Sequence, residues 1–456
     1  MINIRPLAIE IPYREPVIAF SPFAASPHSI FLDSPEGLGR YAYFAPVPEA
    51  LEVATVNGSE NPWDRINDRL NNITLDPIDN LPPFQTGIVG YLGYEMGRHL
   101  ERVPPSPADG TTLPEMIVGA YHLIAAFDTK AKKAWVIATP TPGKSASYTA
   151  CRASTFAEVI ANGSKNLPEP IVPSGKWEPD FVKTKYNAKI EAVIEYIKAG
   201  DIFQTNLTQR FCISRPAGIS AFELYLILRA RNPAPFAAYI NCGQGRAVLS
   251  ASPERFLKLE ADGSVLTEPI KGSRPRGANP EADHRLATEL RLSEKDMAEN
   301  LMIVDLLRND LSKVCEIGSV MTPSLFKLKS FAEMHHLVST VTGKLKKNEN
   351  SISLMKACFP GGSVTGAPKI RAMEIIHELE STRRGPYCGA IAWFGYNGAM
   401  DSSIVIRTLI VERNSIIAQA GGGIVADSSP ELEYDETLHK VRALLRCLDP
   451  EDHSGL

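Results

Sequence analysis

A lysine and a glutamate flank a predicted β-hairpin in the second half of the chain. Lys271 lies in Pro-Ile-Lys-Gly-Ser (269–273) and Glu254 in Ser-Pro-Glu-Arg-Phe (252–256), with a predicted turn at 261–263 between them. Two strands joined by a tight turn can bring both side chains into one cavity, where an amine nucleophile or base stands beside a carboxyl acid or base. Partial desolvation lowers an amine pKa from about 10.4 to about 7 to 8, which favours attack at neutral pH. A surface lysine and a structural Glu–Arg pair are the alternative interpretation.

Two pairs of acidic residues occur at helical spacing. Asp296 and Glu299 lie on a predicted helix over 292–311, and Glu433 and Glu436 lie on the last predicted helix. Residues three apart share one helical face, so the two faces can offer several carboxylate oxygens to one hard cation. Mg2+ usually takes one or two carboxylates together with water and an anionic substrate group. Exposed helix faces with nearby Lys and Arg are the alternative.

Glycines and one arginine are candidates for binding an anion. Gly421-Gly422-Gly423 separate a predicted strand from the last helix, and Gly361-Gly362 with Gly366 precede another helix. Glycine lets backbone N–H groups approach an anion, although tight turns explain the same residues. Neither stretch has the spacing of a nucleotide-binding loop. Arg407 is central in a predicted apolar strand, 403–409, where its charge needs a carboxylate ligand or an internal salt bridge.

The elements that must position these residues are of both kinds. Beyond residue 176, helical spacing alternates with extended stretches, which indicates an α+β architecture. Predicted helices cover 181–199, 221–232, 281–314, 352–357, 367–380 and a last helix from about 430; predicted strands cover 201–214, 236–241, 246–259, 264–269, 331–345, 404–411 and 416–420. Strands at 116–126 and 134–139 and a helix at 155–160 come earlier. The Pro- and Gly-containing stretch 140–177 places the main boundary near residue 176, between regions 1–175 and 176–450.

Length and composition limit the class of protein. The chain has 456 residues, 44% hydrophobic and 22% charged, which is ordinary for a folded globular protein. Its formal net charge of −4 makes nucleic acid an unexpected partner. The first residues lack a basic segment followed by an apolar one, and no run of about 18 apolar residues occurs, so neither secretion nor membrane spanning is expected. Seven scattered cysteines are typical of reduced cytoplasmic thiols.

Taken together, the residues resemble the chorismate-utilising enzymes. This family includes anthranilate synthase component I, aminodeoxychorismate synthase component I, and isochorismate and salicylate synthases. The resemblance covers nearly all of residues 180–450, with a weaker match at 90–95. Its densest stretches are 200–204, 252–256, 269–272, 295–310, 335–339, 359–369 and 420–428. It implies a large α/β sandwich of two antiparallel sheets flanked by helices, with one active site formed mainly by the C-terminal half.

The resemblance also assigns ligands, residue by residue. It implies an Mg2+ site at Glu299, Glu433 and Glu436, with the ion bridging to the ring carboxylate of chorismate. Glu254 matches the general acid that protonates the departing 4-hydroxyl, an effect usually worth about 10² to 10⁴ in rate. His336 matches an auxiliary active-site histidine. The positions that match substrate contacts are Gly272, Ser273, Thr365, Tyr387, Arg407, Gly421, Gly422 and Gly423, of which Tyr387, Arg407 and the last three glycines match those that hold the pyruvyl carboxylate.

Two positions separate the members of the family. Anthranilate synthases typically read Pro-Ile-Ala-Gly where this sequence reads Pro-Ile-Lys-Gly, and the lysine is similar to that of aminodeoxychorismate synthases. The resemblance then implies that Lys271 attacks ring carbon 2 as the 4-hydroxyl leaves, and that ammonia adds at carbon 4 and expels the lysine. Isochorismate and salicylate synthases place a water-activating lysine where this chain has Gln204, which argues against water as the nucleophile.

The expected activity is therefore Mg2+-dependent amination of chorismate to 4-amino-4-deoxychorismate, for 4-aminobenzoate and folate synthesis. The alternatives are anthranilate synthase component I, which eliminates pyruvate, and a non-catalytic amino-acid-binding subunit. No glutaminase nucleophile is recognisable, so the resemblance implies ammonia from a separate glutamine amidotransferase subunit, component II. Residues 31–34 and 39–41 are similar to the tryptophan pocket of the family, which would include Ser34. Feedback-regulated anthranilate synthases read Leu-Leu-Glu-Ser where this chain reads Phe-Leu-Asp-Ser.

Overall fold

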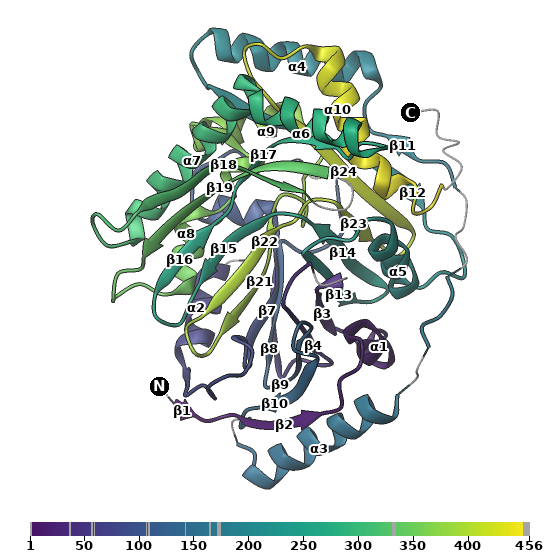
Figure 1. The fold of residues 1–456 in the computed structure, drawn as a ribbon, viewed down its shortest axis with the longest axis vertical. Helices are drawn as coiled ribbons and strands as arrows, with labels where there is room; N and C mark the ends of the chain where they lie inside the picture. The colour runs from purple at the N-terminus through teal and green to yellow at the C-terminus, as the bar shows by residue number, and fades with distance from the viewer. Residues whose placement is uncertain are drawn as a thin grey trace.

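The computed structural model describes residues 2–449 except 36–37, 56–57, 59, 106, 108–109, 142, 164–165, 171–174 and 331–333. Two large antiparallel sheets and the helices that cover them make up most of the molecule (Figure 1). Among the residues described, none of the helices combines the length and apolarity that crossing a bilayer requires. The predicted α+β sandwich of two antiparallel sheets flanked by helices is confirmed.

The first sheet has twelve strands. Its order is β11 (Glu178–Pro179), β12 (Gln204–Ser214), β24 (Ser415–Ile424), β23 (Thr408–Val411), β14 (Arg246–Ser252), β13 (Phe236–Gly243), β3 (Ile30–Asp33), β4 (Tyr41–Ala45), β9 (Leu123–Asp128), β10 (Lys133–Ala138) and β2 (Leu7–Ile11), with β20 (Gly366–Ala367) paired to β12. Side chains alternate between its two faces, as a pleated strand requires. In β14, for example, Ala247 and Leu249 face the covering helices whereas Val248 faces the second sheet.

The second sheet has ten strands. Its order is β17 (Ile270–Pro275), β19 (Met334–Lys344), β16 (Ser264–Thr267), β15 (Arg255–Leu259), β22 (Met400–Ile404), β21 (Ala390–Gly395), β7 (Gly87–Leu92), β8 (Met116–Tyr121) and β5 (Ala50–Ala54), with β18 (Met321–Ser330) paired to β19. A separate parallel pair joins β1 (Ile2–Ile4) to β6 (Ile73–Leu75).

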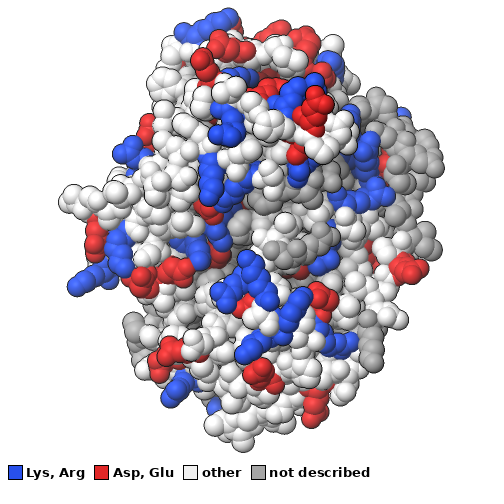
Figure 2. All heavy atoms as spheres, in the orientation of Figure 1, with Lys and Arg blue, Asp and Glu red and all other residues white. Residues whose placement is uncertain are grey.

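Helices cover the outer faces of both sheets. Residues of α1 (Pro16–Phe20), α3 (Ala146–Asn162), α5 (Ala221–Arg231) and α10 (Pro430–Leu445) share one apolar cluster with the first sheet. Residues of α2 (Pro62–Asn71), α7 (Glu294–Val314), α8 (Ser351–Cys358) and α9 (Lys369–Leu379) share another with the second sheet. The other α-helices are α4 (Lys183–Lys198) and α6 (Pro280–Leu292), and α4 shares a fourth cluster with β12, β24, α9 and α10. Acidic and basic side chains are interspersed on the face shown in Figure 2.

Both regions of the chain build both sheets. The boundary near residue 176 falls in the connection between α3 and α4. Strands β3, β4, β9, β10 and β2 nevertheless continue the first sheet from β13, and β7, β8 and β5 continue the second from β21. The apolar layer between the sheets likewise draws residues from both regions. Residues 1–175 therefore supply part of the framework on which the strands of 176–450 are ordered.

Several predicted elements differ from those observed. The strand predicted over 403–409 is wrong, because the chain leaves the second sheet after β22 and joins the first at β23, with Arg407 at φ +52° in the crossing. The helix predicted over 281–314 divides at Ser293, and the strand predicted over 246–259 divides into β14 and β15, which belong to different sheets. The predicted helix at 155–160 is the longer α3. Strand β18 was not predicted, and residues 331–333 of the strand predicted over 331–345 lie outside the described part.

Candidate active site

The predicted acid, nucleophile and carboxylates gather where β17 and β24 meet α7 and α10. Lys271 lies on β17, and its side chain is buried. A Cβ atom at Gly423 of β24 would lie 3.1 Å from Lys271 Nζ and 2.1 Å from Gln204 Nε2, so the glycine lets both side chains approach the strand. Burial lowers the pKa of Lys271, the nearby Glu299 carboxylate opposes that shift, and the Lys440 ammonium reinforces it.

Glu254 lies in the two-residue connection between β14 and β15 and is buried. Burial raises its pKa to about 7, against the opposing effects of a hydrogen bond from Ser363, the charge of Lys271 and a hydrogen bond from the Ile270 backbone N–H. The hairpin of β15 and β16 that precedes Lys271 was predicted from the turn at 261–263. The structure therefore places the Glu254 carboxyl near the Lys271 amine and disfavours the alternative of a surface lysine.

His336 is buried on β19 and is directly paired with Ser273 of β17. The Ser273 hydroxyl and His336 Nδ1 are 2.7 Å apart. Burial, with smaller effects of Arg407 and His335, lowers the pKa of His336 to about 4. The imidazole is consequently neutral at pH 7 and can orient a polar group without adding charge.

Glu299 on α7 and Glu433 on α10 lie on either side of one ammonium group. Lys295 Nζ is 3.9 Å from Glu299 Oε1 and 3.6 Å from Glu433 Oε1. Burial raises the pKa of Glu299, whereas the Lys440 ammonium, 2.6 Å from Glu436 Oε1, lowers the pKa of Glu436. A carboxylate cluster that already attracts one cation has the charge and the hard oxygen donors that suit Mg2+.

The acidic residues do not form a closed metal cage by themselves. In the part of the chain that the structure describes, no three His, Cys, Asp or Glu side chains are arranged to hold an ion. Asp296 forms an ion pair with Arg274, with 3.2 Å between Arg274 Nη2 and Asp296 Oδ2. The arrangement fits an ion that takes one or two protein carboxylates and completes its shell with water and substrate.

The predicted carboxylate-binding residues come from neighbouring segments. The Cys388 N–H, next to Tyr387, donates to the Val405 carbonyl at 2.8 Å, which joins that turn to the crossing that carries Arg407. Burial lowers the pKa of Arg407, and its guanidinium donates to the Lys440 carbonyl. Among the described residues, no carboxylate forms an ion pair with Arg407, which disfavours the internal salt bridge weighed above and leaves its charge available to an anion.

The glycines occupy regular strand rather than a loop. Gly421, Gly422 and Gly423 belong to β24, which is longer than predicted because its pairing with β12 continues to Ile424. A Cβ atom at Gly422 would lie 3.1 Å from Glu433 Oε2, so glycine there opens the strand to the carboxylates of α10. Gly272 has φ +80°, and a Cβ atom there would meet Asp296 at 2.8 Å. Thr365 is fully buried, and its hydroxyl donates to the Gly361 carbonyl at 2.9 Å.

Ser34 lies elsewhere, beside a cavity of about 860 Å³ between the two sheets. Among the described residues its buried hydroxyl has no hydrogen-bond partner, and a Cβ atom at Gly39 in the cavity wall would meet it at 2.5 Å. The Asp33 carboxylate is engaged by Tyr225 and Arg229. The wall of this cavity does not include Lys271 or Glu254; it includes their neighbours, Ile270 and Pro253, among other residues.

Sequence reasoning missed three residues of the site. Lys440 contacts both Glu436 and the Gly421 carbonyl, and Lys295 lies between the carboxylates of α7 and α10. Each lysine stands four residues from a glutamate, a spacing that is also ordinary on exposed helices, so the signal was present but ambiguous. Ser363, the partner of Glu254, had no local signal beyond its place between glycines.

Comparison with known proteins gives consistent results. The model of a family described as chorismate binding enzyme matches residues 27–446. The chain is 36% identical to aminodeoxychorismate synthase component 1 of Salmonella typhimurium, over 98% of this chain and all of that protein. It is 37% identical to anthranilate synthase component 1 of Thermus thermophilus, over 96% and 98% of the two chains. The crystal structure of anthranilate synthase component I from Streptococcus pneumoniae is 31% identical, with a TM-score of 0.81 over 91% of this chain and 94% of that one.

Proposed function

The chain belongs to the chorismate binding enzyme family, and from this premise we propose that it aminates chorismate with ammonia to give 4-amino-4-deoxychorismate. The observation that carries the proposal is the buried pair of Lys271 and Glu254. Burial favours the neutral amine of Lys271, and a Glu254 pKa of about 7 keeps a fraction of that carboxyl protonated at neutral pH. Each group is thus available in the form that a nucleophile or a general acid needs.

The proposed chemistry balances with these two groups. Lys271 Nζ forms a bond to ring carbon 2 while the bond between carbon 4 and its hydroxyl breaks, and Glu254 donates the proton that releases this hydroxyl as water. Ammonia then bonds to carbon 4 while the bond from carbon 2 to Lys271 breaks, so that Lys271 leaves as the neutral amine and the new ammonium group at carbon 4 returns a proton to Glu254. The net change is chorismate plus ammonia to 4-amino-4-deoxychorismate plus water, and the enolpyruvyl group is retained.

The remaining residues are proposed to hold the substrate. Arg407 and Tyr387, with the backbone of Gly421–Gly423, would bind the pyruvyl carboxylate, and His336 would orient Ser273 beside the ring. One or two of the carboxylates of Glu299, Glu433 and Glu436 would hold Mg2+, which when bound would neutralise the ring carboxylate. Chelation should therefore abolish turnover, and added Mg2+ should restore it. Calorimetry of Mg2+ binding tests the site independently of turnover. Glu436→Gln should bind Mg2+ with an affinity several-fold weaker than that of the wild type.

Anthranilate synthase component I is the second candidate. The chain is about as similar to relatives of that name as to the aminodeoxychorismate synthases, at 37% and 36% identity. Lys271 favours amination without loss of pyruvate. A reaction in which ammonia is the only nucleophile does not require an amine buried beside a carboxyl acid.

The test is product analysis after incubation of the chain with chorismate, Mg2+ and ammonium salt. An aminated product that retains the enolpyruvyl group is expected by liquid chromatography with mass detection. Lys271→Ala should lower its formation by about 10²-fold or more, whereas Lys346→Ala, which removes a bond to the Lys313 carbonyl outside the site, should not. Anthranilate with free pyruvate from the unaltered chain would establish the second candidate instead.

Two further proposals concern a partner subunit and a second ligand. Their names designate a component 1, so we propose that a component II amidotransferase supplies ammonia to this chain from glutamine. We also propose that the cavity beside Ser34 binds tryptophan, because its wall includes Leu32, Asp33 and residues 39–41 of the two segments that resemble the tryptophan pocket.

A further inference from the structure

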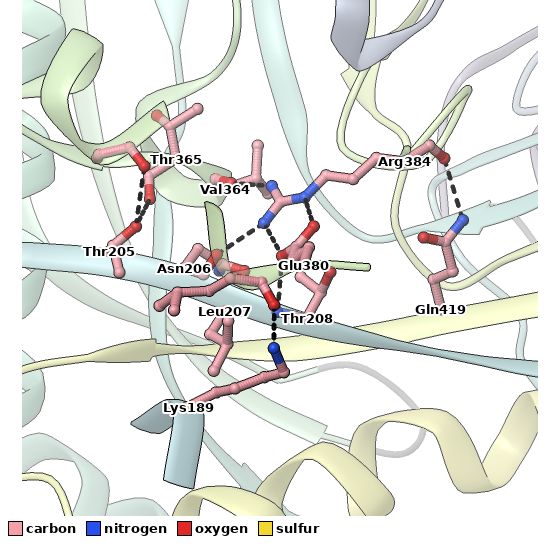
Figure 3. A network of polar contacts seen from close by, with 12 residues as sticks. Lys189, Thr205, Asn206, Leu207, Thr208, Val364, Thr365, Glu380, Arg384 and Gln419 are labelled. Carbon is pink, nitrogen blue, oxygen red and sulfur yellow. Dashed lines mark hydrogen bonds and ion pairs between the residues drawn. The ribbon is translucent and has the colours of Figure 1, made fainter. Parts of the chain in front are cut away.

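Arg384 is a fully buried charge that the reaction above does not use. Its Nε and Nη2 atoms donate to the two carboxylate oxygens of Glu380 at 2.9 and 2.6 Å. Nη1 donates to the Val364 carbonyl at 2.8 Å, and Nη2 also donates to the Asn206 carbonyl at 2.7 Å (Figure 3). The guanidinium carbon stands 4.5 Å from the centre of the Tyr94 ring.

The two carbonyls belong to segments that reach the substrate site. Val364 immediately precedes Thr365, whose carbonyl accepts the Asn206 N–H at 2.7 Å. Asn206 lies on β12, where it pairs with Gly423 of β24, and the next residue pairs with Gly422. One guanidinium therefore fixes the separation between the Thr365 segment and the strand that carries the glycines.

The main chain of Arg384 is fixed as firmly as its side chain. The Glu95 carboxylate accepts the N–H groups of Arg384 and Gly385 at 2.8 and 3.0 Å, and Gln419 of β24 donates to the Arg384 carbonyl at 3.0 Å. Tyr387 follows three residues after Arg384. Its turn is consequently tied to the same network.

Stability alone does not explain this arrangement. A buried ion pair stabilises a fold little compared with apolar residues of similar volume, because both charges lose their hydration. A guanidinium differs in offering several donors in one rigid plane, which an ammonium cannot match. The Arg384 guanidinium donates four hydrogen bonds in three directions, and such a group can fix the relative positions of several backbone segments.

We infer that Arg384 is a positioning residue that holds Thr365, Tyr387 and the Gly422–Gly423 backbone in the geometry that binds chorismate. The inference rests on chorismate as substrate, which the family supplies, and not on which product forms. The test therefore follows chorismate itself, so that failure of the proposed amination would appear only in product identity.

Arg384→Lys is the main variant, because lysine can keep the pair with Glu380 but cannot reach both carbonyls. We expect folded protein by circular dichroism, a fall of about 30-fold or more in kcat/KM for chorismate consumption, and a change mainly in KM. In a Lys271→Ala background without added ammonia, where no aminated product can form in either reaction, calorimetric chorismate binding should weaken at least 10-fold when Arg384→Lys is added. Chorismate binding within twofold of the Lys271→Ala parent would overturn the inference.

Arg229→Lys is the matched control, since Arg229 also donates to a buried carboxylate, Asp33, at 2.6 Å and, in the described part of the chain, has no hydrogen bond to a substrate segment. This control should lower the melting temperature while leaving KM within twofold. An equal rise in KM in both variants would mean that Arg384 has only a general structural role.

Thr365→Ala should raise KM by a smaller factor in the Arg384→Lys background than in the wild type, because the two side chains act through one segment. If Arg384→Lys does not fold, Gln419→Met is the second test, because it removes the hydrogen bond to the Arg384 carbonyl and leaves Arg384 itself in place. A KM raised at least threefold would support the inference, and an unchanged KM would overturn it.

Discussion

Lys271 and Glu254 show how burial alone can prepare two side chains for chemistry. Desolvation disfavours the charged form of each, so it lowers the pKa of the amine and raises that of the carboxyl. The two values move toward each other. Burial thus shifts Glu254 toward its protonated form and Lys271 toward its neutral form, whereas water favours the charged form of both near pH 7.

This pairing predicts a bell-shaped pH profile for kcat/KM. Activity needs Glu254 protonated and Lys271 neutral, so kcat/KM should fall at high pH, where Glu254 is ionised, and at low pH, where Lys271 is protonated; burial raises the pKa of Glu254 to about 7 and lowers that of Lys271. Glu254→Gln should reduce kcat/KM by about 10²-fold or more and remove the high-pH limb. Chorismate consumption measured between pH 5.5 and 9.5 tests this. A high-pH limb that persists in the variant would assign it to another group.

His336 predicts a stability effect at the same scale. Its pKa of about 4 in the folded chain lies below the unfolded value of about 6.5, so the unfolded state binds an extra proton at lower pH. The stabilisation that the neutral ring provides is present above pH 6.5 and is lost as pH falls toward 4, by up to roughly 3 kcal/mol. Urea unfolding of wild type and His336→Asn at pH 7.5 and 5 should show a smaller pH effect in the variant. Equal pH effects would contradict the prediction.

At the scale of elements, α7 depends on one serine. Ser293 ends α6 and caps α7, where its hydroxyl accepts the Asp296 N–H at 3.3 Å. Ser293→Ala should lower the free energy of unfolding by about 1 kcal/mol. It should also raise the Mg2+ concentration needed for half activity, because alanine favours a continuous helix that would displace Glu299. Ser293→Asp keeps the cap and is the control. Equal melting temperatures for the alanine variant and wild type would contradict the prediction that the Ser293 cap stabilises α7.

The elements also show where sequence reasoning succeeds and fails. The hairpin before Lys271 was predictable, because its turn residues and extended flanks are local signals. Arg407 was misplaced in a strand, since no local pattern indicates that a chain passes from one sheet to another between Ile404 and Thr408. Arg384 was not singled out, because its burial depends on Glu380 and two carbonyls distant in sequence. The resemblance supplied the substrate and metal residues that spacing alone left open.

Across the whole molecule, the sheets connect the N-terminal region to the site. Strand β15 begins directly after Glu254, and its neighbour β22 pairs with β21, which in turn pairs with β7 of the N-terminal region. The cavity between the sheets borders both Pro253 and Ile270. A ligand that fills it would therefore contact the chain at the residues next to Glu254 and Lys271.

This continuity makes tryptophan binding testable without an activity assay. A ligand that binds only the folded state stabilises it by RT ln(1 + [L]/Kd), about 2.7 kcal/mol at one hundred times Kd. Tryptophan should raise the melting temperature of wild type, and phenylalanine should do so much less. Ser34→Ala removes the unpaired hydroxyl at the cavity margin and should reduce the tryptophan effect, whereas Lys346→Ala should not. Chorismate turnover at saturating tryptophan then shows whether the contacts at Pro253 and Ile270 transmit the binding. If tryptophan does not raise the melting temperature of wild type, this cavity does not bind tryptophan. The contacts of the Asp33 carboxylate with Arg229 and Tyr225 would then be the structural reason, because they leave that carboxylate unavailable to a ligand.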